Sequence, residues 1–461
     1  MKALLINLAP IGGPPDHHPR HHVAPVDLAI CAAILEGAGH EVQLWDTALD
    51  PRETLPELIT RARASVPDLL LVRPLLGTAS DAAALARACG GLRLVFGNAV
   101  DAARDTLIGD RPGGGAFDAA LVGEPEPVLI DLLPHLAEGE LPEQLLGLAK
   151  DTRRWAQPRP FLEQLDSLPA PAHHHLVGKG YQFHYPLDQP ERLEMGYLLS
   201  SRGCALGCTF CSPSERESLG KGYRWRSAES IVEEIQQLKA LGANALYFID
   251  DFFSFSTARV RELCEAMIAA ELQLPWAAQV RAHGLDSELL ALMRAAGCSS
   301  LCFGAESGSD RMLKQVRKGV TTQLVREQVA RIQAAGIATV GYFIVGMPGE
   351  GDEERAETYR FIEALGPDLA QVHIFNVMPG SSAEALYPEL LAPEATKFSG
   401  PVALDARMDA LDAERRRFYL RYYLGPRYLL RTLRRRGKAL ARNLPSEAAF
   451  ALRSVRYFLG A

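Results

Sequence analysis

The sequence predicts an α/β protein, with two successive α/β units joined by a linker and followed by a helical C-terminal extension. Short apolar runs alternate with helical patterns over most of the 461 residues, and such alternation implies parallel sheets. A chain of this length is also too long for one ordinary hydrophobic core. We expect the units at 1–150 and 193–390, the linker at 151–192 and the extension at 391–461.

The first unit begins with a strand at Ala3–Leu8, a helix at Val26–Ala38 and a strand at Glu41–Trp45. Further strands are expected at 69–72, 92–96 and 119–122, with a helix at 81–88. This order predicts a doubly wound, Rossmann-like sheet, which binds ligands at the carboxyl ends of its strands. Those ends carry small or polar residues that let a large ligand approach the backbone: Gly77, Thr78, Gly97, Asn98, Gly123 and Glu124.

The linker is rich in proline and polar residues, as in "QPRPFLEQLDSLPAPAHHHL" at 157–176. His173, His174 and His175 raise the question of a metal site. No cysteine or carboxylate pattern accompanies them, so we interpret this run as a solvated linker.

The second unit repeats strand and helix six times. The strands are expected at 195–200, 245–249, 276–280, 300–303, 339–345 and 369–375, and the intervening helices at 228–240, 257–270, 287–296, 322–335 and 353–364. Directly after the first strand, Cys204, Cys208 and Cys211 form a CxxxCxxC run. A tight loop with this spacing can direct three thiolates at one cubane cluster and leave its fourth iron free. Zinc, a redox thiol or chance are the alternatives, but zinc usually takes a fourth ligand nearby and the next cysteine is Cys264.

Polar residues or glycines also follow the other strands of this unit. Individually these are weak signals, because adjacent carboxylates often cap helices and a lone glutamate is often structural. Arg281 is the best defined, since a guanidinium at a strand end can pair bidentately with a carboxylate. The full set, with Phe210 inside the cysteine run, is Asp250, Asp251, Arg281, Glu306, Ser307, Gly346 and Met347.

This ordered recurrence after the cysteine run resembles the radical S-adenosylmethionine (SAM) superfamily. The resemblance implies a partial (β/α)6 TIM-like barrel, with Cys204, Cys208 and Cys211 as the catalytic ligands of a [4Fe–4S] cluster. It also implies SAM binding by Phe210 and the seven strand-end residues, and reductive SAM cleavage to a 5′-deoxyadenosyl radical that abstracts hydrogen from an unactivated carbon. A flavodoxin- or ferredoxin-type reductant would supply the electron.

The first unit, including "AILEGAGHEVQLWDT" and "FDAALVGEPEPVLIDLL", resembles the cobalamin (B12)-binding domain that precedes many radical SAM barrels. The resemblance implies cobalamin near the six strand-end residues of this unit, and C-methyl transfer to a small-molecule or lipidic substrate. His18 stands where the family motif DxHxxG has its cobalt ligand, but His21 replaces the glycine and a plain polar loop is the commoner interpretation.

Two other functions stay open. The first is a radical SAM cyclase, ring-contracting or rearranging enzyme of tetrapyrrole, hopanoid or natural-product biosynthesis. The second is a non-catalytic iron–sulfur electron-transfer or sensing protein, which would need no SAM pocket. Cys264, Cys298 and Cys302 are interpreted as buried apolar residues rather than a second cluster. Cys31 and Cys89 lie alone in expected helices, which argues against the methylthiotransferase branch.

The composition predicts a cytoplasmic protein. The chain is 48% hydrophobic and 23% charged, lacks a signal-peptide pattern and has no run of about 20 apolar residues. Its eight cysteines show no disulfide framework, and its net charge of −7 argues against nucleic-acid binding. The helical stretches expected at 406–424 and 426–440 are basic. They are expected to cap the barrel, with peripheral contact to an anionic membrane as the alternative.

Overall fold

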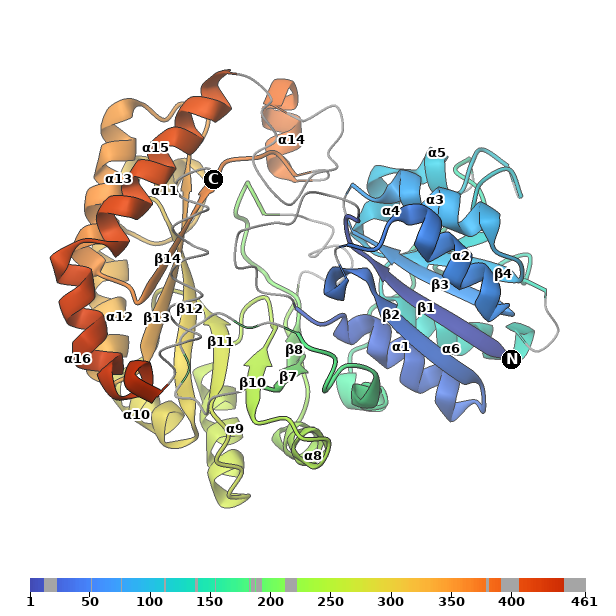
Figure 1. The fold of residues 1–461 in the computed structure, drawn as a ribbon, viewed down its shortest axis with the longest axis horizontal. Coiled ribbons are helices and arrows are strands. Elements are labelled where there is room, and N and C mark those ends of the chain that lie inside the picture. The colour runs from blue at the N-terminus through green and yellow to red at the C-terminus, as the bar shows by residue number, and fades with distance from the viewer. Residues whose placement is uncertain are drawn as a thin grey trace.

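The computed structural model describes residues 1–442 except 12–22, 51, 76, 112, 137–139, 154, 182, 184–186, 188–192, 212–221, 379–380 and 391–405. Figure 1 shows two α/β units side by side, with the first unit in blue next to a larger barrel-like unit. The loop that contains His18 and His21 lies outside the described residues, as does the end of the chain after Arg442.

The first unit is the doubly wound sheet that the sequence predicts. Its strand order is β2-β1-β3-β4-β5-β6, and every pair is parallel except β5 with β6. The chain therefore changes direction at the neighbouring strands β1 and β3, the place where such sheets bind ligands. The strands are β1 (Lys2–Leu8), β2 (Glu41–Asp46), β3 (Leu69–Pro74), β4 (Leu92–Phe96), β5 (Ala119–Leu121) and β6 (Leu148–Ala149).

Helices cover both faces of this sheet. Successive strand residues alternate between two cores, because side chains of a strand point to opposite faces. Leu5 and Leu71 pack with α1 and α6, whereas Leu4 and Leu70 pack with α2 and α3 on the other face. The helices are α1 (Val26–Gly37), α2 (Leu55–Ser65), α3 (Ala79–Ala88), α4 (Asn98–Ala102), α5 (Arg104–Leu107) and α6 (Pro125–Leu136).

The second unit is an open barrel of parallel strands in the order β14-β13-β12-β11-β10-β7. The strands are β7 (Met195–Leu198), β10 (Ala245–Phe248), β11 (Trp276–Val280), β12 (Cys298–Glu306), β13 (Ala338–Val345) and β14 (Leu369–Ile374). The helices are α8 (Ala228–Ala240), α9 (Thr257–Ala269), α10 (Ser287–Ala295), α11 (Asp310–Gln315), α12 (Thr322–Ala334) and α13 (Asp352–Leu365). The predicted succession of six strand–helix units is thus confirmed.

The two units share a hydrophobic core. Leu5 and Leu71 of the first sheet belong to the same buried cluster as Tyr181 of the linker and Tyr197 and Tyr247 of the barrel. The rings of Tyr181 and Tyr197 meet edge to face, with their centroids 5.7 Å apart. Such a continuous core fixes the first unit relative to the barrel.

The open edge of the barrel is covered by α15 (Ala406–Tyr423), which lies along β14 in Figure 1. The backbone N–H of Ala370 donates to the Tyr423 hydroxyl at 2.9 Å, and that of Val372 donates to the Tyr419 hydroxyl at 2.6 Å. Tyrosine hydroxyls therefore satisfy edge groups of β14 that would otherwise be free to pair with another strand.

α16 (Pro426–Arg442) continues from α15 and leaves Leu429, Leu430 and Leu433 exposed. Within the described residues, no helix has the length and apolar character needed to cross a membrane.

Candidate active site

The cysteine loop follows β8 (Ser201–Arg202), which pairs with β9 (Arg224–Trp225) at the start of the barrel. Gly203 has a φ of 91°, so the turn out of β8 uses a backbone conformation that favours glycine. Two hydrogen bonds at Thr209 then hold the loop: its N–H donates to the carbonyl of Val316 at 3.0 Å, and its carbonyl accepts from the N–H of Ala383 at 2.9 Å. The backbone of the loop is thus fixed by residues from beyond β12 and β14.

Phe210, beside the last cysteine, packs against a small apolar cluster that includes Met347 and Val316. Met347 is fully buried in this cluster, together with Met312, Phe375, Val377 and Ala383. The structure therefore brings together two residues that the sequence predicts for SAM binding. They form an apolar wall beside the cysteine loop.

Three charged side chains meet next to the loop: Glu306 and Arg281 come from strand ends, and Lys318 comes from the segment between α11 and α12. Lys318 Nζ lies 2.6 Å from Glu306 Oε1 and 5.8 Å from the centre of the Phe210 ring. Arg281 Nη2 donates to the carbonyls of Lys318 and Gly319, both at 2.8 Å. Arg281 Nε is buried and has no hydrogen-bond partner among the described residues. A buried N–H donor without a partner is costly, so this atom is suited to an anionic ligand.

The charges around Cys208 shift the pKa of its thiol in opposite directions. Burial raises the pKa of Cys208, and the neighbouring Glu306 carboxylate raises it further, whereas Lys318 and Arg281 lower it. The two cations therefore favour the thiolate, the form that binds iron. At the outer side of the loop, the pKa of Tyr223 is raised by burial and by Cys204, with which its side chain forms a hydrogen bond.

The donor set fits an iron–sulfur cluster. Three thiols lie on one loop, with Cys208 buried and Cys204 and Cys211 partly buried. Two cations stand beside them to balance the negative charge that a thiolate-bound cluster carries. The unpaired N–H of Arg281 adds a donor for an anionic group bound next to the cluster.

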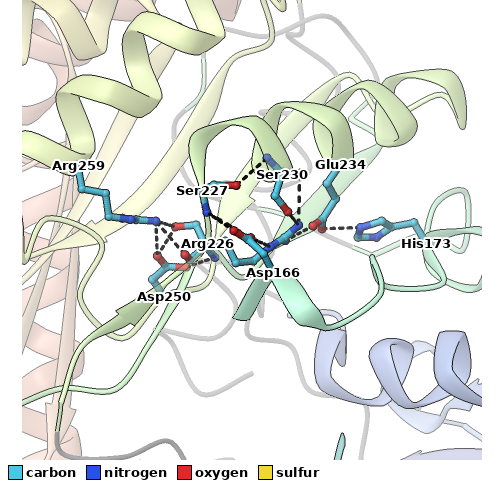
Figure 2. Close-up of polar contacts among 9 residues, drawn as sticks. Asp166, His173, Arg226, Ser227, Ser230, Glu234, Asp250 and Arg259 are labelled. Atoms are coloured by element: carbon cyan, nitrogen blue, oxygen red, sulfur yellow. Dashed lines mark hydrogen bonds and ion pairs between the residues drawn. The ribbon is translucent and has the colours of Figure 1, made fainter. Parts of the chain in front are cut away.

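Asp250 faces the protein, in contrast to the expected SAM contact. Its carboxylate is fully buried and accepts hydrogen bonds from the Ser200 N–H at 2.7 Å, the Ser200 hydroxyl at 2.5 Å and the Ser201 hydroxyl at 2.6 Å. Arg259 Nη2 lies 4.0 Å from the same carboxylate, and Figure 2 shows this pair. Asp250 thus ties the end of β10 to the segment that leads into the cysteine loop, while Asp251 is exposed in the next turn.

Two other expected SAM contacts also have protein partners. The Ser307 hydroxyl lies 3.1 Å from the Thr358 hydroxyl of α13 and accepts from the Ser309 N–H at 3.1 Å. Gly346 has a φ of 76°, donates its N–H to Glu350 and lies under Leu411 of α15. A Cβ at Gly346 would come within 2.6 Å of Leu411, so the glycine lets α15 pack closely here.

In the first unit, three predicted glycines lie just beyond the carboxyl ends of β3, β4 and β5. Gly77, Gly97 and Gly123 have φ values of 96°, 100° and 87°, so they leave a turn at each strand end without a side chain. The Thr78 hydroxyl donates to the carbonyls of Leu8 at 3.0 Å and Leu75 at 2.9 Å. Asn98 is the first residue of α4. Two of these glycines, Gly77 and Gly97, thus follow the neighbouring strands β3 and β4 at this edge of the sheet.

Glu124, also expected near cobalamin, instead belongs to a buried ion cluster with Glu126, Arg202 and Arg224. Glu124 Oε1 lies 2.9 Å from Arg202 Nη1 and 2.9 Å from Arg224 Nη2, and Glu126 Oε1 lies 2.5 Å from Arg202 Nη2. The side chains of Arg202, Glu124 and Glu126 are at most 2% exposed. Because Arg202 directly precedes Gly203, this cluster joins the first unit to the base of the cysteine loop.

The sequence analysis did not identify Lys318, Tyr223, Arg202 or Glu126. Lys318 follows its partner Glu306 by 12 residues, and Glu126 precedes Arg202 by 76, so spacing gave no signal for either pair. The remaining barrel cysteines agree with the apolar interpretation. Cys264 and Cys298 lie in the hydrophobic core between the barrel strands and their helices, and Cys302 lies in the core that the two units share. Cys298 and Cys302 both lie within β12, a strand longer at both ends than predicted.

Comparison with known proteins places this site in a family. Residues 198–362, which contain the cysteine loop and β10 to β13, match the Radical SAM superfamily. An uncharacterised methyltransferase of Pyrococcus horikoshii is 30% identical over 271 residues, or 58% of this chain and 57% of the relative. Cytidylyl-2-hydroxyethylphosphonate methyltransferase of Streptomyces wedmorensis is 28% identical over 305 residues, or 58% of this chain and 56% of the relative. The matches thus span little more than half of either relative.

A solved structure extends the likeness to both units. The radical SAM methyltransferase TsrM from Kitasatospora setae, determined with cobalamin and a [4Fe–4S] cluster, superposes with a TM-score of 0.65 at 19% identity. The superposition covers 85% of this chain and 76% of TsrM. The radical SAM match therefore covers residues 198–362, and the first unit and the barrel together have the fold of TsrM.

Proposed function

We propose that this protein is a radical SAM enzyme whose [4Fe–4S] cluster is held by Cys204, Cys208 and Cys211. The observation that carries the proposal is the meeting of these thiols with Lys318 and with the unpaired Nε of Arg281. An electron carrier would need the cysteines but not a buried donor for a further anion beside them. The family match over 198–362 supports the same function.

When bound, the cluster would supply the electron that converts SAM to methionine and a 5′-deoxyadenosyl radical. The chain's own part is to bind and orient SAM. Arg281 Nε would donate to the methionine carboxylate, a charge-assisted hydrogen bond that would help to orient SAM. Glu306 holds the Lys318 ammonium beside the cysteine loop, and Phe210 with Met347 excludes water from one side.

We further propose that the first unit binds cobalamin and that the reaction is methyl transfer to an unactivated carbon of a small-molecule or lipidic substrate. Cobalamin would supply the methyl group. Its binding edge would be formed by Gly77, Gly97 and Gly123, where a sheet of this order binds ligands. Two observations support the proposal: TsrM, of the same fold, was solved with cobalamin, and both relatives named above are methyltransferases.

SAM cleavage tests the proposed function. The full chain is purified without oxygen, reconstituted with iron and sulfide, reduced with dithionite and incubated with SAM, and 5′-deoxyadenosine is measured. We expect the Cys208→Ala variant to form none. Cys89→Ala is the matched control, because Cys89 lies at the end of α3 in the first unit and should leave the product unchanged. Undiminished product from Cys208→Ala would overturn the proposal.

A further inference from the structure

The three histidines of the linker have defined partners, so the solvated-linker interpretation is corrected. His173 is buried, and its Nε2 lies 2.7 Å from Oε1 of Glu234 on α8. Figure 2 shows this contact, with Arg226 on the other oxygen of the same carboxylate. The linker is thus fixed to the barrel at this point. His174 and His175, in contrast, point to the first unit.

His174 and His175 converge on one carboxylate of α1. Nε2 of His174 lies 3.1 Å from Glu36 Oε1, and Nε2 of His175 lies 2.9 Å from the same oxygen. All three ligand atoms lie within 4.8 Å of one another. The two rings are held together by the turn η3 (His173–His175), with their centroids 4.2 Å apart. Two imidazole nitrogens and one carboxylate oxygen therefore surround a common point.

This geometry is close to that of a bound metal ion. Zinc binds imidazole nitrogen and carboxylate oxygen at about 2.0–2.2 Å, so neighbouring ligands of a tetrahedral ion lie about 3.3 Å apart. The two nitrogen–oxygen distances of 2.9 and 3.1 Å would need to lengthen by only a few tenths of an ångström.

We propose that Glu36, His174 and His175 form a binding site for a divalent transition-metal ion, for which Zn²⁺ is the best match. Two imidazoles favour zinc over magnesium or calcium, which prefer oxygen ligands. The fourth position is open to water, since the side chains of His174 and Glu36 are 53% and 31% exposed. The site is independent of the cysteine loop.

Metal at this site would fasten the first unit to the linker. The linker already contacts α1 about two turns before Glu36, where the N–H of Ala172 donates to the carbonyl of Ala29 at 3.0 Å. The ion would add a second attachment at Glu36, near the end of α1. Because His173 in the same turn is held by Glu234 of α8, the attachment continues into the barrel. Bound metal is therefore expected to raise the melting temperature of the full chain.

Zinc binding to the cluster-loaded full chain tests the proposal. The cysteines of the loop are occupied by iron in this form, so they do not compete for zinc. Zn²⁺ affinity is measured by isothermal titration calorimetry, and the zinc ligands are identified by X-ray absorption spectroscopy. The variants are Glu36→Gln, which keeps both rings, and the double variant His174→Ala/His175→Ala. His135→Ala is the control, because it removes a histidine of α6 outside this cluster.

We expect one zinc per chain with nitrogen and oxygen ligands, at least tenfold weaker binding in Glu36→Gln, and loss of that binding in the double variant. The His135→Ala control should bind as the wild type does. Equal affinity in the wild type and in Glu36→Gln or the double variant would overturn the site, and so would absence of zinc or a sulfur-containing ligand shell. SAM cleavage is measured in parallel and reports separately on the proposed function.

Discussion

Replacing Arg202 by methionine should destabilise the junction between the first unit and the cysteine loop. Arg202 Nη1 lies 3.2 Å from Glu126 Oε2 and its Nη2 lies 2.5 Å from Oε1, and both hydrogen bonds of Glu126 in the described structure come from this guanidinium. Glu124 would keep Arg224, but Glu126, whose side chain is 0% exposed, would be left with a charge and no partner. Removal of one partner from a buried ion pair costs about 3–5 kcal/mol, the loss expected here.

Urea denaturation of the Arg202→Met variant measures this loss. The pair Arg153–Asp110 is the control: its distance is 2.6 Å, but its side chains are 73% and 62% exposed, so Arg153→Met should cost at most about 0.5 kcal/mol. Adding Glu126→Gln to Arg202→Met removes the unpaired charge and should recover part of the loss. A loss below about 1 kcal/mol for Arg202→Met, or no recovery in the double variant, would refute the reasoning.

Three further outcomes are expected. Arg281→Met should weaken SAM binding at least tenfold, measured by equilibrium dialysis, because it removes the unpaired Nε; the iron content should stay unchanged. Undiminished binding would contradict the role of Arg281 in binding the SAM carboxylate. Tyr423→Phe should lower the unfolding free energy by about 1–3 kcal/mol, because its hydroxyl both accepts from and donates to Ala370 at the barrel edge; an unchanged thermal transition would contradict this. Burial raises the pKa of Glu350 from 4.5 to about 7. Between pH 4.5 and 7 the folded state therefore keeps a proton that the unfolded state has lost. The free energy of unfolding falls as the pH rises through this window. In urea denaturation at pH 8, Glu350→Gln should therefore be more stable than the wild type by about 1–2 kcal/mol, after allowance for partial exposure of the carboxyl. This difference should shrink towards pH 5. Equal differences at the two pH values would contradict the raised pKa.

Much of the fold could be predicted because each strand has clear local boundaries. Trp276–Val280 was predicted without error: Pro275 precedes the strand and a polar segment follows it. β12 was predicted too short, since Gly304 and Glu306 lack strand propensity and are held by pairing with β13. α2 was missed although Thr54 and Glu57 form a capping box at its start. That signal is local and could have been found.

The site was harder to predict, because polar partners lie far apart in the sequence. The cysteine loop was located from spacing alone. Glu124 was assigned to cobalamin because it follows a strand, yet its partner Arg202 lies 78 residues later. Asp250 was assigned to SAM for the same reason and is bound by Ser200 and Ser201. A strand-end position thus indicated which residues lie near the carboxyl edges of the two sheets, but not which way their side chains turn.

Cofactor content tests the central proposal most directly, namely that one chain holds a cluster in the barrel and cobalamin in the first unit. The protein is reconstituted with iron and sulfide without oxygen, incubated with hydroxocobalamin and desalted, and iron and cobalt are measured. We expect about four irons and about one cobalt per chain in the wild type, and cobalt without cluster iron in Cys208→Ala. Four irons without cobalt would contradict the cobalamin proposal, and unchanged iron in Cys208→Ala would contradict the cluster site.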